Sequence, residues 1–436
     1  MAATPAPGNG ATAPRVDDID LSDLDWWIRP MAEREAAFAV LRAERPIAPM
    51  TLEPLPSLGL PATPYWAVTR HADIVEASRH PELFCSGKGT NIADLTPEFN
   101  EFFGSMINMD DPRHARMRRI VSRGFTPRQL EKMRADVEGI AAGIIDGIIE
   151  RGECDFVTDV AALLPLRIIV DMMGIPRSEE RFIFDRTNII LGFTDPEYVP
   201  QDDPMVVGTA ILTAGAELAQ MVQELGEARQ RDPGDDLVSA LVTSEVDGEH
   251  LSPQELASFF ILLVVAGNET TRNAIAHGLW ALTEHPEQKR RWLDDIEGMT
   301  PTAIEEIVRW SSPVIHFRRT VTRDGVRLGD HEFSEGERVV LWYWSGNRDE
   351  DVFDDPHTFD IGRTPNEHIG FGGPGPHFCL GAHLARREIS VMFGELLRRM
   401  PDIRAAGEPE RLRSGFINGI KHMPAEWDPA RAAIRA

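Results

Sequence analysis

One cysteine of this sequence lies where its thiol can do chemistry. Cys379 follows a stretch rich in glycine and proline, residues 370–376, which predicts a tight, rigid loop. After it, apolar residues recur at multiples of four up to Pro401, at Leu384, Met392, Leu396 and Met400. This spacing predicts a helix. Cys379 is therefore expected at the N-terminus of that helix.

A helix N-terminus changes what a thiol can do. Its unpaired N–H groups and its dipole favour a thiolate over a thiol. Such a thiolate acts as a nucleophile, a redox centre or a metal ligand. The alternative is a small buried hydrophobic residue, because free cysteine is often buried. The glycines around Cys379 and the nearby His377 favour a chemical role.

A second cluster interrupts a long apolar segment. Ser252 and Glu255 form a capping box, and the helical pattern continues to His285, where a proline stops it. These 33 or so residues predict a buried helix of roughly 50 Å. In its middle stand Ala266-Gly267-Asn268-Glu269-Thr270-Thr271. A buried carboxylate is costly, so this cluster indicates function, although threonine hydroxyls can also bond back to carbonyls one turn earlier.

Basic residues occur at three further places. Pro112 begins a helix on which His114 and Arg118 share a face, as an anion site or as a solvated basic face. Glu306 and Arg309 lie three apart on another predicted helix, where an exposed pair contributes little to stability. The strand after Pro313 carries Arg318 and Arg319, and neighbouring strand residues face opposite ways.

Together these segments resemble the cytochrome P450 family. The stretch Gly375-x-His377-x-Cys379-x-Gly381 is similar to its haem-binding loop, residues 266–271 to its I-helix motif, and Glu306-x-x-Arg309 to its K-helix signature. One departure is visible: Gly373 and Pro374 separate Phe371-Gly372 from Gly375, where the common pattern has one residue. Actinobacterial members that act on sterol side chains and methyl-branched lipids have a similar longer loop.

The resemblance implies a cofactor and a set of site residues. Cys379 is expected to bind the iron of haem b, iron protoporphyrin IX, as its axial thiolate and metal ligand. Glu269 and Thr270 are the expected catalytic residues, which deliver protons to dioxygen. Arg319 is favoured over Arg318 as a propionate contact. The expected cofactor-binding residues are His114, Arg118, Ala266, Arg319, Phe371, His377, Cys379 and Gly381.

The resemblance also implies a fold class. We expect the cytochrome P450 fold, mainly α with small β-sheets. Residues 1–16 have the composition of a disordered tail, and residues 17–436 are expected to form a single haem-thiolate monooxygenase domain. Glu306 and Arg309 are expected to join Arg363 in a buried network with a folding role.

Composition limits the partners and the compartment. A net charge of −25 and an isoelectric point near 4.9 argue against nucleic acid. Three scattered cysteines give no disulfide framework and fit a reducing cytoplasm. The N-terminus lacks an apolar signal segment. The longest apolar run, 256–267, is shorter than the roughly 20 residues that cross a bilayer. We expect a cytoplasmic protein that is not anchored to a membrane.

The expected reaction is insertion of one oxygen atom from O₂ into an unactivated C–H bond. No flavin or iron–sulfur extension is present in the sequence, so ferredoxin and ferredoxin reductase are the expected electron donors. One rival is a peroxygenase, which the acid–alcohol pair Glu269-Thr270 disfavours. A second rival is a haem protein that binds ligands without turnover.

The expected substrate is apolar. Family pocket walls correspond to the long connection after Cys85, which we expect to be irregular, the break near 196–204, the strand after Pro313 and the turn 414–420. A branched-chain lipid, an isoprenoid or a sterol side chain is favoured, and a macrolide or other secondary metabolite is the alternative. The expected wall residues are Ile92, Leu95, Phe99, Phe102, Phe103, Met106, Val314, Ile315, Phe416 and Ile417.

Overall fold

A computed structural model describes residues 14–54, 59–125, 131, 133–243 and 251–433, without the side chains of Arg123 and Pro204. Most of the predicted tail, residues 1–13, lies outside the described residues. Val16, the last residue of the predicted tail, already begins the 3₁₀ turn η1 (Val16–Asp18).

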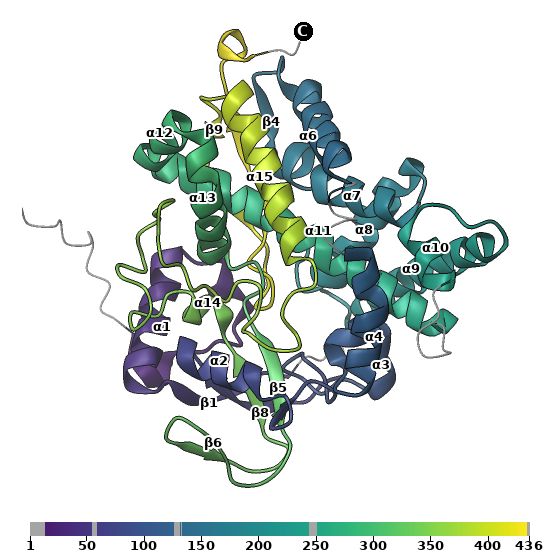
Figure 1. Ribbon diagram of the computed structural model, residues 1–436. Coiled ribbons are helices and arrows are strands. Elements are labelled where there is room, and N and C mark those ends of the chain that lie inside the picture. The colour runs from purple at the N-terminus through teal and green to yellow at the C-terminus, as the bar shows by residue number, and fades with distance from the viewer. Residues whose placement is uncertain (1–13, 55–58, 126–130, 132, 244–250, 434–436) are drawn as a thin grey trace, which may run out of the picture.

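Helices dominate the chain, as the sequence predicts (Figure 1). The α-helices are α1 (Met31–Glu44), α2 (His71–Arg79), α3 (Pro97–Gly104), α4 (Arg113–Val121), α6 (Arg134–Ile148), α7 (Leu163–Met173), α8 (Glu180–Leu191), α9 (Pro204–Arg231), α10 (Leu237–Thr243), α11 (Pro253–Glu284), α12 (Pro286–Asp294), α13 (Ile296–Ser311), α14 (Tyr343–Gly346) and α15 (Ala382–Arg399). Shorter helical turns include η2 (Leu24–Ile28), η4 (Ser105–Asn108), η5 (Ser122–Phe125), the π-turn η6 (Val157–Ala161), η7 (Arg177–Glu179) and η8 (Pro429–Arg431).

The described strands form small separate sheets, with β1, β5 and β8 at one end of the molecule and β4 and β9 near the other (Figure 1). The largest has the order β1-β2-β8-β5-β3, with only β2 and β8 parallel. Its strands are β1 (Ile47–Leu52), β2 (Thr63–Val68), β8 (Arg338–Leu341), β5 (Phe317–Val321) and β3 (Phe84–Cys85). The smaller sheets are β4 (Glu153–Asp155) with β12 (Pro424–Glu426) and β9 (Arg404–Ala405), β6 (Val326–Leu328) with β7 (His331–Phe333), and β10 (Glu410–Arg411) with β11 (Ile420–His422).

The long helix α11 runs through the centre of the molecule (Figure 1). The predicted capping box is present, because Ser252 and Glu255 bond to each other's backbone N–H groups. The first half of α11 packs in one core with α7, α9 and α10 through side chains such as Phe259 and Phe260. The second half packs in another core with α6, α13 and α15 through residues such as Ile275. The two cores therefore hold α11 on either side of the 266–271 cluster.

The segment between Cys85 and Met109 is more regular than expected. It contains α3 and η4, so the prediction of an irregular connection is wrong there. The side chain of Thr96 accepts from the N–H of Phe99, and Pro97 occupies the first turn. Together these two residues form an N-terminal helix signal that the mixed composition of the segment obscures.

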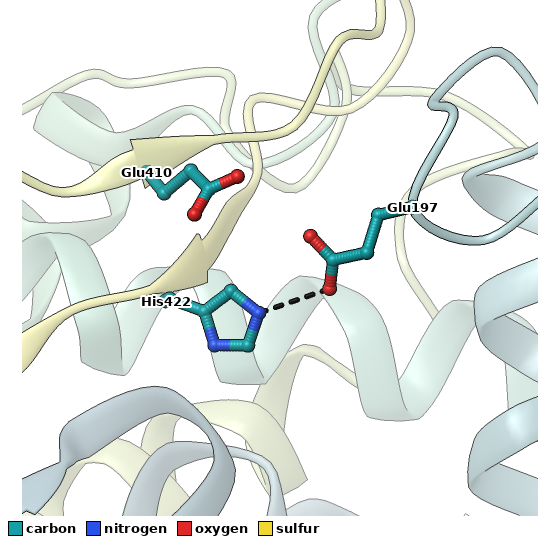
Figure 2. A group of neighbouring side chains, drawn as sticks. All are labelled: Glu197, Glu410 and His422. Atoms are coloured by element: carbon teal, nitrogen blue, oxygen red, sulfur yellow. Dashed lines mark hydrogen bonds and ion pairs between the residues drawn. The ribbon is translucent and has the colours of Figure 1, made fainter.

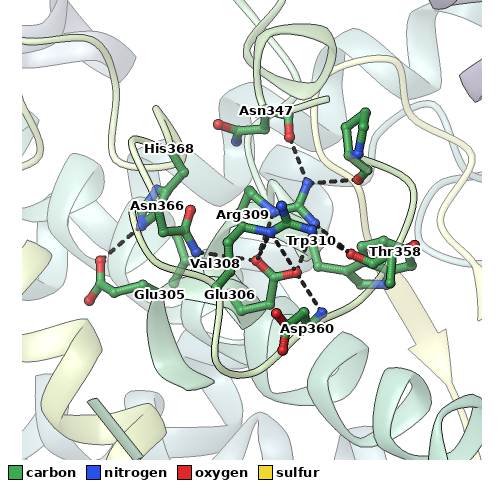
Figure 3. Close-up of polar contacts among 12 residues, drawn as sticks. Glu305, Glu306, Val308, Arg309, Trp310, Asn347, Thr358, Asp360, Asn366 and His368 are labelled. Carbon is green, nitrogen blue, oxygen red and sulfur yellow. Dashed lines mark hydrogen bonds and ion pairs between the residues drawn. The ribbon is translucent and has the colours of Figure 1, made fainter. Parts of the chain in front are cut away.

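The predicted network on α13 is confirmed (Figure 3). Glu306 and Arg309 are fully buried and form a bidentate ion pair with distances of 2.7 and 2.8 Å. Arg363 Nε lies 3.2 Å from the Glu306 carboxylate, and the side chain of Asn366 and the backbone N–H of Asp360 also donate to it. The surface-pair alternative is therefore excluded.

One helix in the described part of the chain passes a length and composition test for a membrane span. It is Met205–Arg231 of α9, in which 39% of the most apolar 18-residue window is buried inside the protein. A helix packed on the surface of a core passes the same test, so it is weak evidence for a membrane span.

Candidate active site

One cavity gathers nearly all of the predicted site residues. It lies between the middle of α11, α4, β5 and the loop before α15. Of the predicted set, only Glu269 does not border it. The members that line the cavity are His114, Arg118, Ala266, Thr270, Arg319, Phe371, His377, Cys379 and Gly381.

The cysteine loop is pressed against α2. A Cβ atom added at Gly373 would lie 2.5 Å from the hydroxyl of Ser78, and one at Gly375 would overlap the carbonyl oxygen of the same serine. Cys379 is fixed by its own backbone, whose N–H donates to the carbonyl of Phe371 at 3.0 Å. The lengthened loop therefore packs on α2 at Gly373 and Gly375, and Cys379 still stands just before α15.

The Cys379 side chain is enclosed by protein but keeps exposed surface, because it borders the cavity. Burial raises the pKa of the Cys379 thiol, while the N–H groups of Gly381 and Ala382 and the charge of Arg118 oppose that shift. The N–H groups at the start of α15 thus act in the predicted direction, and burial of the thiol acts against them. A bound cation would further stabilise the deprotonated form.

Four groups that can carry positive charge surround the same cavity. The rings of His114 and His377 lie 4.2 Å apart, and Arg118 Nη2 donates to the carbonyl of Phe378 at 2.7 Å. Burial, together with the charges of Arg319, His114 and Arg118, lowers the pKa of His377 to about 2. His377 is therefore neutral at pH 7, and the positive charge in this part of the cavity comes from Arg118 and Arg319.

The two neighbouring arginines of β5 separate as strand geometry requires. Arg319 borders the cavity on the same face as Phe317. Arg318 points the other way, to Asp94 at 2.6 Å and to backbone carbonyls of residues 91–93. The arrangement favours Arg319 over Arg318 as the group that meets a cofactor.

The donor set fits haem. The thiol of Cys379 is a suitable ligand for iron. Arg118 and Arg319 hydrogen-bond to backbone carbonyls, and no ion pair with a carboxylate is seen for either within the described ranges. Two propionates would balance this charge, since arginine binds carboxylates well. The residues present thus match an iron porphyrin with two acidic side chains.

The acid–alcohol pair on α11 has a specific arrangement. Glu269 is buried, and its Oε1 accepts from Arg272 on the same helix and from Asn273 Nδ2 at 3.0 Å. Its Oε2 is also buried and has no hydrogen-bond partner among the described residues. Thr270 borders the cavity, and its hydroxyl donates to the carbonyl of Ala266 at 2.8 Å.

One buried acid was not predicted from the sequence. Glu388 of α15 borders the cavity and hydrogen-bonds Thr271, and burial raises its pKa to about 8. Its Oε2 has no partner in the described part of the chain. The sequence does indicate a buried position for this acid. Glu388 is four residues from both Leu384 and Met392, so it lies on the apolar face of the helix.

The apolar walls come mostly from helices rather than from the predicted loops. Of the ten predicted wall residues, only Met106 and Val314 border the cavity. Phe99 and Phe103 belong to a separate cluster with Val199 and Ile211. The helical wall residues that the prediction omits are Ile169, Met172, Phe259, Leu262 and Leu263.

The sequence matches a known family model. A model described as "Cytochrome P450" matches residues 182–401, which include the central acid–alcohol cluster, the α13 pair and the cysteine loop. The chain belongs to the cytochrome P450 family and is a haem-dependent monooxygenase. This confirms the family and the fold class predicted from the motifs.

Curated relatives cover nearly the whole chain. The methyl-branched lipid omega-hydroxylase of Mycobacterium tuberculosis is 50% identical over 96% of this chain and 97% of its own. The steroid C26-monooxygenase of Rhodococcus jostii is 40% identical over 95% of this chain and 86% of its own. A Mycobacterium marinum cytochrome P450 solved in complex with pseudoionone has a TM-score of 0.88 and 42% identity, with 96% and 100% of the two chains covered.

Proposed function

We propose that this monooxygenase hydroxylates a branched-chain lipid, an isoprenoid or a sterol side chain near its end. The observation that carries the proposal is the helical wall of the cavity, where η4, α7 and α11 contribute apolar side chains. The charged groups that border the cavity lie on α4, β5, α15 and the cysteine loop. A long apolar chain fits the helical side, because burial of apolar surface supplies roughly 25 cal/mol per Å².

The names of the relatives support the same substrate class. One acts on methyl-branched lipids and another on a steroid at C26, which are both extended apolar molecules. The solved relative binds pseudoionone. A macrolide or other secondary metabolite remains the alternative substrate.

In this proposal Cys379 binds the iron of haem b, while His114, Arg118, Arg319 and His377 hold its propionates. The bound haem supplies the activation of O₂, with two electrons from ferredoxin and ferredoxin reductase. Ala266, Phe371 and Gly381 border the cofactor space. We place the enzyme in the cytoplasm as one haem domain over residues 17–436.

Glu269 and Thr270 manage protons on α11. The buried Oε2 of Glu269 has no partner among the described residues and can carry a proton, since only Oε1 is held by Arg272 and Asn273. Rotation of the carboxyl then brings the proton towards the cavity. The Thr270 hydroxyl already borders the cavity and can turn from the Ala266 carbonyl to donate there.

A substrate panel tests this proposal. The holoenzyme is titrated with a methyl-branched fatty acid, a straight-chain fatty acid of equal length, a sterol and a macrolide. Loss of the haem-bound water is followed as a spin-state shift in the absorption spectrum. We expect the branched lipid or the sterol to give the tightest shift.

Product analysis completes the test. Reconstitution with a surrogate ferredoxin and its reductase should yield a product oxidised near the chain end. A shift with the macrolide alone would reject the lipid proposal while leaving the monooxygenase assignment intact. Leu262→Arg places a charge on the apolar wall and should abolish the lipid shift, whereas Leu212→Arg, at a half-exposed position of α9, should leave it unchanged.

A further inference from the structure

A second cavity lies far from Cys379. It has a volume of about 760 Å³ and is bordered by η2, the start of α1, the C-terminal end of α11 and the β10–β11 hairpin. Ala281 and Glu284 of α11 line it. At 1.5 Å per residue, Ala281 stands roughly 16 Å along the helix from Thr270. The catalytic cavity does not include these residues.

Arg411 on the wall of this cavity has no counter-ion. Its guanidinium makes no hydrogen bond or ion pair with any described residue, and its Nη1 is fully buried. Glu408 is the acid that most influences Arg411, but the two form no ion pair. Buried arginines are normally paired with a carboxylate, and Arg411 has no such partner among the described residues.

A second arginine behind Arg411 is also poorly satisfied. Arg34 is 1% exposed, and its one hydrogen bond runs from Nη1 to Asn418 Oδ1 at 3.3 Å. Its Nε and Nη2 have no partner among the described residues. Burial and the charges of Arg411 and Arg348 lower the pKa of Arg34 to about 9. Glu35 opposes this shift of the Arg34 pKa, but its carboxylate is paired with Arg348 at 3.1 Å.

The other cations at the cavity are already neutralised. Lys421 Nζ lies 2.8 Å from both Glu197 and Glu410 and 3.2 Å from Asp195. Arg413 pairs with Asp25. Neither cation therefore needs a ligand.

Figure 2 shows Glu197, Glu410 and His422 grouped together, and Glu410 also borders this cavity. The spacing of their ligand atoms resembles that of a metal site. The Lys421 ammonium bonds to both carboxylates, and His422 bonds to Asp155 and Glu197. These internal ion pairs account for the group, so it supports no metal site.

We propose that the second cavity binds an amphipathic carboxylate, whose head group pairs with Arg411 and whose chain lies against apolar wall residues. The head group would supply the counter-charge that Arg411 and Arg34 lack. The apolar walls near it are Ile28, which is 42% exposed, Met31 and Trp280. A site with one charged anchor and an apolar wall selects such molecules.

The test uses decanoate and the neutral decanol as matched probes. The haem cavity of the holoenzyme is first saturated with an azole, so that binding there cannot contribute. Binding is then measured by calorimetry and by the fluorescence of tryptophan, since Trp280 and Trp310 border the second cavity. We expect decanoate to bind at least roughly tenfold more tightly than decanol, as charge-assisted hydrogen bonds imply. Equal binding of the two probes would overturn the proposal.

Two variants locate the site. Arg411→Gln should weaken decanoate binding by roughly tenfold or more, whereas Arg181→Gln, an exposed arginine paired with Asp185 on α8, should leave it unchanged. Glu408→Gln removes the competing acid and should tighten binding. If Arg411→Gln does not fold, the Glu408→Gln result decides, and unchanged affinity in that variant contradicts the proposal.

Discussion

Two helices of this protein carry a buried glutamate followed three residues later by an arginine. The two carboxylates differ in how many hydrogen bonds they accept. Glu306 and Arg309 on α13 are three apart and buried, and so are Glu269 and Arg272 on α11. Both oxygens of Glu306 accept hydrogen bonds from several donors. Glu269 leaves Oε2 unpartnered among the described residues.

The difference fits a structural role for the pair on α13 and the proposed proton-carrying role for Glu269. Every donor around Glu306 fixes it in one position, so a change there disturbs the fold. Glu269 has one oxygen with no partner among the described residues, and its neighbour Thr270 borders the cavity. Spacing alone does not distinguish the two pairs, because their surroundings decide the role.

The largest expected effect is the loss of stability when the Glu306–Arg309 pair is broken. Glu306→Gln leaves Arg309 and Arg363 buried without a carboxylate, which should cost about 3–5 kcal/mol in the free energy of unfolding. Urea denaturation and haem content measure this loss. Glu138→Gln, which breaks the exposed pair with Arg134, should show no measurable change. Equal stability of the two variants would contradict a structural role for Glu306.

A change at the Glu269–Arg272 pair should reduce catalysis rather than stability. Glu269→Gln cannot carry the proton, so product formation should fall about 100-fold. Stability should fall less than in Glu306→Gln, because the amide oxygen can still accept from Arg272 and Asn273. Steady-state product formation and urea denaturation of the same sample separate the two effects. Normal activity together with lost stability would assign Glu269 a structural role.

Thr270→Ala should have a smaller effect, which appears in coupling. The variant still takes up electrons, but protons are misdirected and peroxide is released. The ratio of product to NADH consumed should fall by roughly tenfold. This factor corresponds to the free energy of about one hydrogen bond to a charged group. Measuring NADH, peroxide and product together checks this. Unchanged coupling would remove Thr270 from proton delivery.

Glu388 should have the smallest effect on product formation and should act instead on how stability depends on pH. Its pKa is raised from 4.5 to about 8 by burial, so the folded protein keeps a proton that the unfolded chain releases. The free energy of unfolding should therefore be highest below about pH 4.5 for this group and fall as pH rises towards 8. Glu388→Gln should remove this decline, as seen by thermal melting across that range. An unchanged pH dependence would show that Glu388 is ionised in the folded state.

Sequence patterns predicted the long elements and the groups around the cavity. The capping box at Ser252, the stop before Pro286 and the helix after Cys379 are all local signals, and the structure has each of them. The choice of Arg319 over Arg318 matches the orientation of their side chains. That choice rested on the family resemblance.

Features that depend on tertiary packing were missed. The substrate walls come from α7 and α11, because residues distant in sequence meet only when the helices pack. The resemblance gave Glu269 a role in proton delivery, but the sequence did not show that its carboxyl lies behind the cavity wall and bonds to Arg272. The burial of the Cys379 thiol, which opposes the effect of the helix N-terminus on its pKa, also depends on packing that the sequence does not show.

The central claim is that Cys379 is the axial thiolate of a catalytic haem. The most direct measurement is the absorption spectrum of the dithionite-reduced protein with CO, compared with Cys379→His. We predict a strongly red-shifted Soret band for the natural protein and its loss in the variant. A band typical of histidine-ligated haem in the natural protein, or an unchanged spectrum in the variant, would contradict the account.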